Sequence, residues 1–81
     1  MTITAGQCRA ARAFLDWSRE DLAAAAKVAV RTIVDFERGA RSPQNSTLTV
    51  IAAAFEQAGI EFTNGSEPGV KLRVVAEAPV S

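Results

Sequence analysis

The stretch that decides the fold of this chain is residues 18–39, SREDLAAAAKVAVRTIVDFERG. It predicts two short helices joined by a tight turn at Lys27 and Val28. Ser18 can cap the first helix with its hydroxyl, and Asp21, three residues later, can accept a hydrogen bond from the Ser18 amide. Residues 22–26 are small and apolar, so another helix can approach them closely. A helix this short needs tertiary support, which the rest of the chain must supply.

The second predicted helix runs from about residue 30 to residue 38, and Gly39 follows it, where a left-handed backbone favours glycine. Ile33 and Phe36 share one face with the stem of Glu37. The other face carries two valines, an arginine and an aspartate: Val30, Arg31, Val34 and Asp35. Such a face suits a DNA major groove, where arginine donates to guanine, aspartate accepts from cytosine N4 and small aliphatic groups contact the thymine methyl.

These residues, with Arg12 and Pro43 around them, resemble the helix-turn-helix of the lambda-repressor-like, XRE-type family of bacterial and phage regulators. The residues that carry the resemblance are Ala11, Arg12, residues 17–23 (WSREDLA), Val28, Thr32, Ile33, residues 36–39 (FERG) and Pro43. The resemblance covers roughly residues 7–62, and spacing, caps and core pattern agree with one another. It implies that the helix over residues 30–38 is the recognition helix.

Three residues depart from the family's usual pattern. Arg19 stands where members often carry a glutamine that binds phosphate and supports the recognition helix; arginine can bind phosphate more strongly but supports the helix differently. Lys27 stands where the turn often has glycine, and a left-handed lysine costs about 1 kcal/mol. Ala29 stands where serine or threonine often caps the recognition helix, and a missing cap costs about 1 kcal/mol.

A further helix is predicted over residues 4–15, with Thr4 as its cap. Its inner face carries Cys8, Ala11, Arg12 and Leu15 at helical spacing. Arg12 on that face needs an acidic partner, because an unpaired buried charge is unfavourable. Glu37 is the candidate, and the resembled family pairs an arginine and a glutamate at these places. We therefore expect a structural ion pair that locks the first helix to the end of the recognition helix.

The C-terminal part predicts one more helix and a hairpin. Asn45 or Ser46 is expected to cap a helix that ends near residue 58, with an apolar stripe at Leu48, Ile51, Ala52 and Phe55. Residues 60–62 and 70–74 alternate around turn residues 63–69, which indicates a β-hairpin. A lone hairpin is unstable in water, so it must pack on the helices, pair with a second chain, or both. The candidate dimerisation residues are its apolar positions: Ile60, Phe62, Val70, Leu72 and Val74.

The predicted fold is therefore mainly α: a four- to five-helix lambda-repressor-like helix-turn-helix domain followed by a short C-terminal β-hairpin. The domain would occupy residues 1–58 and the hairpin residues 59–75, and residues 76–81 are expected to form a disordered tail. No apolar run is long enough to span a membrane and the N-terminus lacks a signal-peptide pattern, so a cytoplasmic, nucleoid-associated protein is expected.

Composition and charge limit the function classes. The formal net charge is zero, but residues 1–41 hold seven basic and five acidic residues, whereas residues 42–81 hold two and four. This balance argues against a generic polyanion binder, so specific contacts must supply more of the affinity for DNA. The sequence has no histidine, no nucleophile with an evident base partner and no glycine-rich phosphate loop, so we do not expect an enzyme. Cys8, the only cysteine, is expected to be a small buried hydrophobe, and neither a metal nor a cofactor is expected.

The leading hypothesis is a sequence-specific transcriptional regulator, a repressor that binds a near-palindromic operator as a homodimer, with half-sites about 34 Å apart. Arg31 is the expected main base reader; Asp35, four residues on, either reads a base or holds Arg31. The full set of expected base contacts is Ala29, Val30, Arg31, Val34 and Asp35. The expected phosphate contacts are Ser18, Arg19, Thr32, Arg38 and Arg41.

The alternative hypothesis is a protein-interaction module of the same fold, an antitoxin or an anti-activator. It would bind its protein partner, a toxin or an activator, through the hairpin and tail. The zero net charge and the weak cap at Ala29 favour it slightly. The two roles are compatible, because antitoxins of the resembled fold often repress their own promoters. A neighbouring reading frame for a small toxic protein would favour the alternative.

Overall fold

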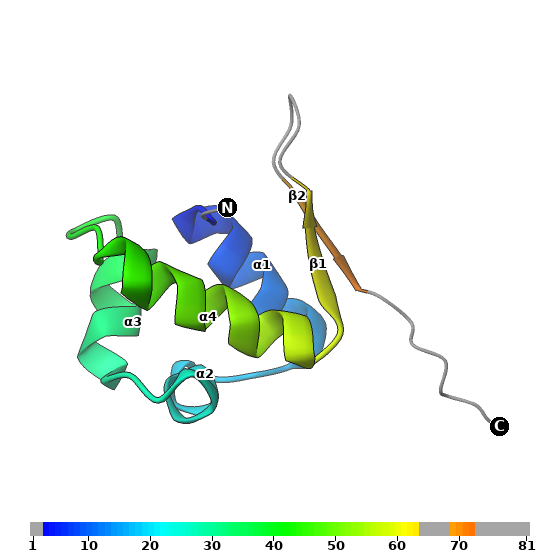
Figure 1. Ribbon diagram of the computed structural model, residues 1–81, viewed down its shortest axis with the longest axis horizontal. Coiled ribbons are helices and arrows are strands. Elements are labelled where there is room, and N and C mark those ends of the chain that lie inside the picture. The colour runs from blue at the N-terminus through cyan, green and yellow to red at the C-terminus, as the bar shows by residue number, and fades with distance from the viewer. Residues whose placement is uncertain (1–2, 64–68, 73–81) are drawn as a thin grey trace, which may run out of the picture.

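The computed structural model describes residues 3–63 and 69–72, which form four helices and one β-hairpin (Figure 1). The elements are, in order, α1 (Ala5–Leu15), α2 (Arg19–Ala26), α3 (Val30–Glu37), α4 (Asn45–Gln57), β1 (Ile60–Thr63) and β2 (Gly69–Leu72). The mainly helical, lambda-repressor-like fold predicted from the sequence is confirmed. The prediction of a disordered tail concerns residues that lie outside the described part.

Capping boxes start the first two helices. At α1 the Thr4 hydroxyl accepts from the Gln7 amide (3.0 Å) and the Thr4 amide donates to Gln7 Oε1 (2.9 Å). At α2 Ser18 and Asp21 exchange the same two bonds, each 3.0 Å long, as the sequence predicts. Because these bonds satisfy amides that have no partner within a helix, they fix where each helix begins.

Left-handed residues end α1 and α2 and follow α3. Asp16 (φ 58°) and Lys27 (φ 60°) are the C-caps of α1 and α2, and Gly39 (φ 73°) follows α3. The glycine adopts this conformation without strain, whereas a lysine does not. The chain therefore turns sharply between α2 and α3 in spite of the residue at position 27.

The predicted cap of α4 was wrong. The N-cap is Gln44, whose side chain makes no capping hydrogen bond, and Asn45 is already helical. The first turn closes from the Leu48 amide to the Gln44 carbonyl at 3.0 Å, and Leu48 is buried. The helix thus begins earlier than predicted and without a side-chain cap, because a cap contributes only about 1 kcal/mol and a helix can begin without one.

The core lies where α2 and α4 meet, with α1 and α3 beside them. Its fully buried side chains include Leu22, Ile33, Ile51 and Phe55. Trp17 stacks on Phe55 with ring centroids 5.8 Å apart, and Phe62 meets the same ring edge-on at 5.8 Å. These aromatic contacts join the α1–α2 connection, the end of α4 and the hairpin into one core.

The hairpin packs its inner face on the helices. Its strands are antiparallel, with Ile60 opposite Leu72 and Phe62 opposite Val70. Ile60 and Phe62 are buried, whereas Glu61 and Thr63 between and after them are exposed. The side chains of Ile60 and Phe62, which were expected at a dimer contact, are thus buried in the core of the protomer itself. Val70 is half-buried against the same core, and Val74 lies outside the described residues.

Candidate nucleic-acid interface

The outer face of α3 is exposed, as a recognition helix requires. Ile33 and Phe36 anchor the inner face in the core. On the outer face the Arg31 side chain is 84% exposed, and Val30 is 37% exposed. Val34 is half-buried beside them, so the outer face combines one long cationic side chain with aliphatic groups. This arrangement fits a helix that meets base edges in a major groove.

Two of the predicted base-contact residues form an ion pair. Arg31 Nε lies 3.5 Å from Asp35 Oδ2, one helical turn along α3. The Asp35 side chain is 23% exposed and thus largely covered by protein, whereas most of the Arg31 side chain is in contact with solvent.

The N-terminal end of α3 has no side-chain cap. Ala29 is the exposed, extended N-cap residue, and the amides of Thr32 and Ile33 return to its carbonyl at 3.0 and 3.4 Å. Thr32, expected at a phosphate, is half-buried in this first turn. The start of α3 therefore depends on packing and on its neighbours, since no local side chain caps it.

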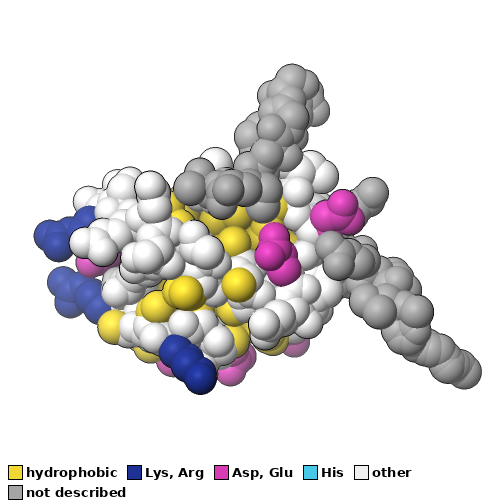
Figure 2. Space-filling view, viewed as in Figure 1, with side chains coloured by type: hydrophobic (Ala, Val, Ile, Leu, Met, Phe, Trp, Pro, Cys, Tyr) yellow, Lys and Arg dark blue, Asp and Glu magenta, His cyan; other side chains and the backbone are white. Residues whose placement is uncertain are grey.

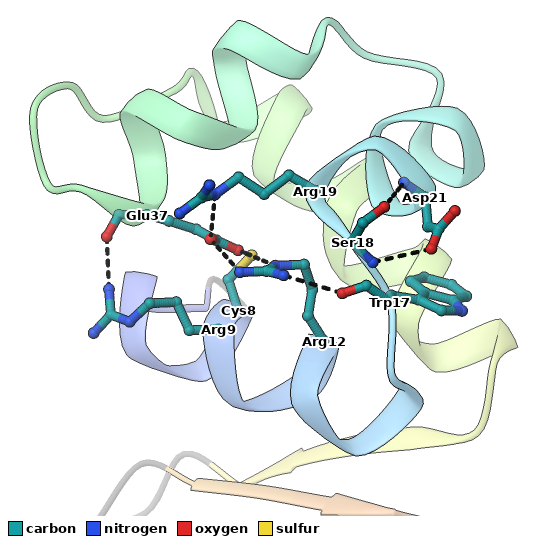
Figure 3. Close-up of polar contacts among 8 residues, drawn as sticks. All are labelled: Cys8, Arg9, Arg12, Trp17, Ser18, Arg19, Asp21 and Glu37. Carbon is teal, nitrogen blue, oxygen red and sulfur yellow. Dashed lines mark hydrogen bonds and ion pairs between the residues drawn. The ribbon is translucent and has the colours of Figure 1, made fainter.

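The C-terminal end of α3 is held by a buried carboxylate. Glu37 is 4% exposed. Arg12 of α1 donates two hydrogen bonds to its carboxylate, from Nε to Oε2 at 2.7 Å and from Nη2 to Oε1 at 2.8 Å (Figure 3). The third nitrogen, Nη1 of Arg12, donates to the Trp17 carbonyl at 3.0 Å. Both residues of the predicted structural pair are thus brought together in a two-pronged arrangement that sets direction as well as distance.

Three more residues donate to Glu37, two of them to its carboxylate and one to its main-chain carbonyl, and the sequence reasoning did not place them there. Cys8 donates its thiol proton to Glu37 Oε2 at 3.1 Å, and Arg19 donates from Nε to Oε1 at 3.3 Å. Arg9 donates from Nη1 to the Glu37 main-chain carbonyl at 2.6 Å (Figure 3). We refer to Cys8, Arg9, Arg12, Arg19 and Glu37 as the Glu37 network. Beyond the predicted Arg12–Glu37 pair, the sequence signal for this network was the surplus of basic residues in the N-terminal half.

The Glu37 network keeps its carboxylate charged. Burial on its own raises the pKa of Glu37, but hydrogen bonds from Arg12 and Cys8 and the charge of Arg12 outweigh it, so the pKa lies below its ordinary value. The hydrogen bond to Glu37 raises the pKa of Arg12. Burial, followed by the hydrogen bond and negative charge of Glu37, raises the pKa of the Cys8 thiol. Cys8 is therefore a neutral donor in the native protein.

The predicted phosphate contacts are distributed around α3. Ser18 is exposed but its hydroxyl caps α2, and Arg19 is 46% exposed with its Nε turned toward Glu37. Arg38 and Arg41 are exposed on the loop after α3. Figure 2 shows basic side chains projecting at the end of the molecule that carries α3 and this loop, whereas two prominent acidic side chains stand nearer the hairpin. Cationic groups thus lie beside α3.

Comparison with known proteins agrees with this geometry. A family model described as helix-turn-helix matches residues 9–58, which include α2, α3, α4 and most of α1. No curated protein matches the chain. None of the helices in the described part of the chain is long and apolar enough to cross a membrane. The matched family consists of DNA-binding regulatory domains, which are not typically enzymes. Because the match covers more than half of its residues, the chain belongs to the XRE-type helix-turn-helix family of DNA-binding regulators.

Proposed function

We propose that this protein is a sequence-specific transcriptional repressor that binds a near-palindromic operator as a homodimer. The observation that carries the proposal is α3: its outer face is exposed, and the Glu37 network holds its C-terminal end against α1 and α2. A rigidly held helix can present side chains to bases at a fixed angle, which sequence discrimination requires. The protein would act in the cytoplasm, at the nucleoid.

Arg31 is the proposed principal base reader. The Arg31 side chain is 84% exposed, whereas the side chain of its ion-pair partner Asp35 is 23% exposed. Arginine makes two parallel hydrogen bonds to guanine O6 and N7, the most frequent specific contact in the major groove. Val30 and Val34 would contact thymine methyl groups, and Ala29 at the exposed start of the helix would lie close to a base edge.

The proposed phosphate anchors are Arg19, Arg38 and Arg41, with Ser18 and Thr32 as polar contacts. Phosphate contacts fix register and orientation but carry no sequence information. Arg38 and Arg41 follow α3 directly, so they can reach the backbone that borders the groove. Because the chain has no net charge, binding through these few cations would be weak unless base contacts add to it.

The hairpin is the proposed dimerisation element. Ile60 and Phe62 pack in the core of their own protomer, and Val70 is half-buried against it. The proposed partner contact therefore rests on Leu72 and Val74, whose side chains lie outside the described part of the chain, together with the exposed part of Val70. The two strands form a sheet of their own in the described part of the chain, and an edge strand of such a sheet can pair with a strand of a second copy. Two recognition helices would then enter successive major grooves about 34 Å apart.

The test starts with selection of bound sequences from a random duplex pool by the purified wild-type protein. We expect enrichment of a near-palindrome and tight binding that persists at 0.2 M salt. Arg31→Ala should relax preference at one base pair in each half-site, by about 1–3 kcal/mol. Arg41→Ala should weaken binding to all sequences alike and reduce the salt slope by about 1.

Gln57→Ala, at the exposed end of α4, is the control for substitution itself. Sedimentation of the free protein measures the dimer directly. Binding that is weak, insensitive to sequence and abolished at 0.2 M salt would refute the proposal, as would a strict monomer that protects a single half-site.

One observation supports the second candidate, an antitoxin or anti-activator. Phe14 on α1 is 52% exposed, which makes a large apolar side chain available to a protein partner, a toxin or an activator. Co-purification of the protein with the product of a neighbouring reading frame, and loss of that complex in Phe14→Ser, would support this role. Operator binding that is unchanged in Phe14→Ser would show that the two surfaces are separate.

A further inference from the structure

The ion pair on α3 is asymmetric. Arg31 Nε lies 3.5 Å from Asp35 Oδ2, yet the arginine side chain is 84% exposed and the aspartate only 23%. A short side chain with two rotatable bonds, mostly covered by protein, keeps one position. A long exposed arginine has many rotamers of similar energy. The aspartate is therefore the fixed partner, and the arginine is the group whose conformation the pair restricts.

The printed contact of the pair is made by Nε of the guanidinium, which lies 3.5 Å from Asp35 Oδ2. A carboxylate on the Nε side is compatible with an end-on approach, in which the terminal nitrogens Nη1 and Nη2 donate to another acceptor. Two parallel Nη–H groups match O6 and N7 of a guanine in an end-on, two-pronged approach. An arginine without this partner could also approach a base through its Nε edge, or turn to a phosphate.

A direct contact of Asp35 with a base is less favourable. Its carboxylate is largely covered and already faces a cation. Reading a cytosine would require it to leave Arg31 and to carry an unscreened negative charge toward a polyanion. Paired with Arg31, the carboxylate charge is compensated within the protein.

We propose that Asp35 is a positioning residue that acts through Arg31, fixing the guanidinium so that its two terminal nitrogens meet one guanine end-on. The inference rests on the proposed function, because it presumes that α3 reads bases. The inference restricts the operator sequence that we expect: the Arg31–Asp35 pair selects one guanine per half-site, and Asp35 alone selects no cytosine.

The experiment compares wild type, Arg31→Ala, Asp35→Ala and the double variant on the selected operator and on the same duplex with that guanine pair replaced. Arg31→Ala should lose about tenfold to hundredfold of discrimination at this pair. Asp35→Ala should lose discrimination at the same pair, and should add nothing in the Arg31→Ala background. Its binding to unrelated DNA should stay equal or rise, because a negative charge is gone. A purely structural defect would lower both.

Asp35→Glu is the matched rescue variant, since glutamate four residues after arginine can also pair with it; it should recover part of the discrimination. Urea unfolding of each variant separates binding from folding. If Asp35→Ala changes preference at another base pair, additively with Arg31→Ala, Asp35 reads a base itself and the inference falls while the proposed function stands. Unchanged discrimination in Asp35→Ala overturns the inference in the same way. A wild-type protein that enriches no sequence overturns both.

Discussion

Glu37→Gln is the substitution with the largest expected effect on stability, because it removes the charge at the centre of the Glu37 network. The glutamine keeps the size of the side chain but leaves Arg12 without a counter-ion, at a site where the Glu37 side chain is 1% and the Arg12 side chain 17% exposed. Breaking one partner of a buried pair costs about 3–5 kcal/mol. The partial hydration of Arg12 places the expected loss near the lower limit, about 3 kcal/mol.

Arg19 adds little to this loss. Its side chain is 46% exposed and its Nε lies 3.3 Å from Glu37 Oε1, so it can turn to water when the charge is removed. A loss of about 3 kcal/mol is a large share of the 5–15 kcal/mol that stabilises a typical domain. For a domain of this size it lowers the melting temperature by roughly 12–24 °C. In urea the midpoint falls by roughly 1–3 M.

The assay is urea unfolding followed by the fluorescence of Trp17, the single tryptophan, which stacks on Phe55 in the core. Glu56→Gln, an exposed position on α4, is the matched control and should change the free energy of unfolding by less than about 0.5 kcal/mol. Replacing both Arg12 and Glu37 by methionine should recover much of the loss, because no unpaired charge remains buried. Equal midpoints for Glu37→Gln and Glu56→Gln would refute the assignment of the network as the lock between α1 and α3.

The same network predicts a pH dependence. The pKa of Glu37 lies below its ordinary value of 4.5, because hydrogen bonds from Arg12 and Cys8 outweigh its burial. A carboxyl group with a lowered folded-state pKa contributes its full stability above the unfolded-state value and loses it as pH falls through the folded-state pKa. Wild type should therefore lose stability progressively below about pH 4.5, and Glu37→Gln should show a flatter profile in this range. Parallel profiles for the two proteins would contradict this reasoning.

Three smaller predictions test local features. Ala29→Ser supplies the cap that α3 lacks and should raise the free energy of unfolding by about 1 kcal/mol in a urea titration; no gain would mean that the serine hydroxyl does not reach the first-turn amides. Lys27→Gly removes a left-handed lysine and should stabilise by up to about 1 kcal/mol, whereas Lys27→Ala should not. The Cys8 thiol is fully buried and its pKa is raised, so a thiol reagent should label it only as fast as the protein opens; labelling at the rate of a free thiol under native conditions would disprove its burial.

Much of the fold could be predicted because its signals are local. The Ser18–Asp21 capping box joins residues three positions apart, and Gly39 needs only its own backbone preference. The stripe of α4 repeats every three or four residues, so periodicity identifies its buried face without knowledge of its neighbours. The failure at Gln44 shows the limit of this approach: a side-chain cap contributes only about 1 kcal/mol, which is too little to fix the residue at which a helix begins.

The sequence by itself determined the helices, their turns, the inner face of α3 and membership of a helix-turn-helix family, since these depend on neighbours within one or two turns. Apart from the Arg12–Glu37 pair, which the sequence predicted, the tertiary structure alone decided which distant groups meet. Arg19 and Glu37 are 18 residues apart, and Gln7 donates to the carbonyl of Thr63 across 56 residues. Such contacts depend on how helices cross, and crossing is set by packing of the whole core. For the same reason, only the fold could show that Ile60 and Phe62 are buried in the core of their own protomer.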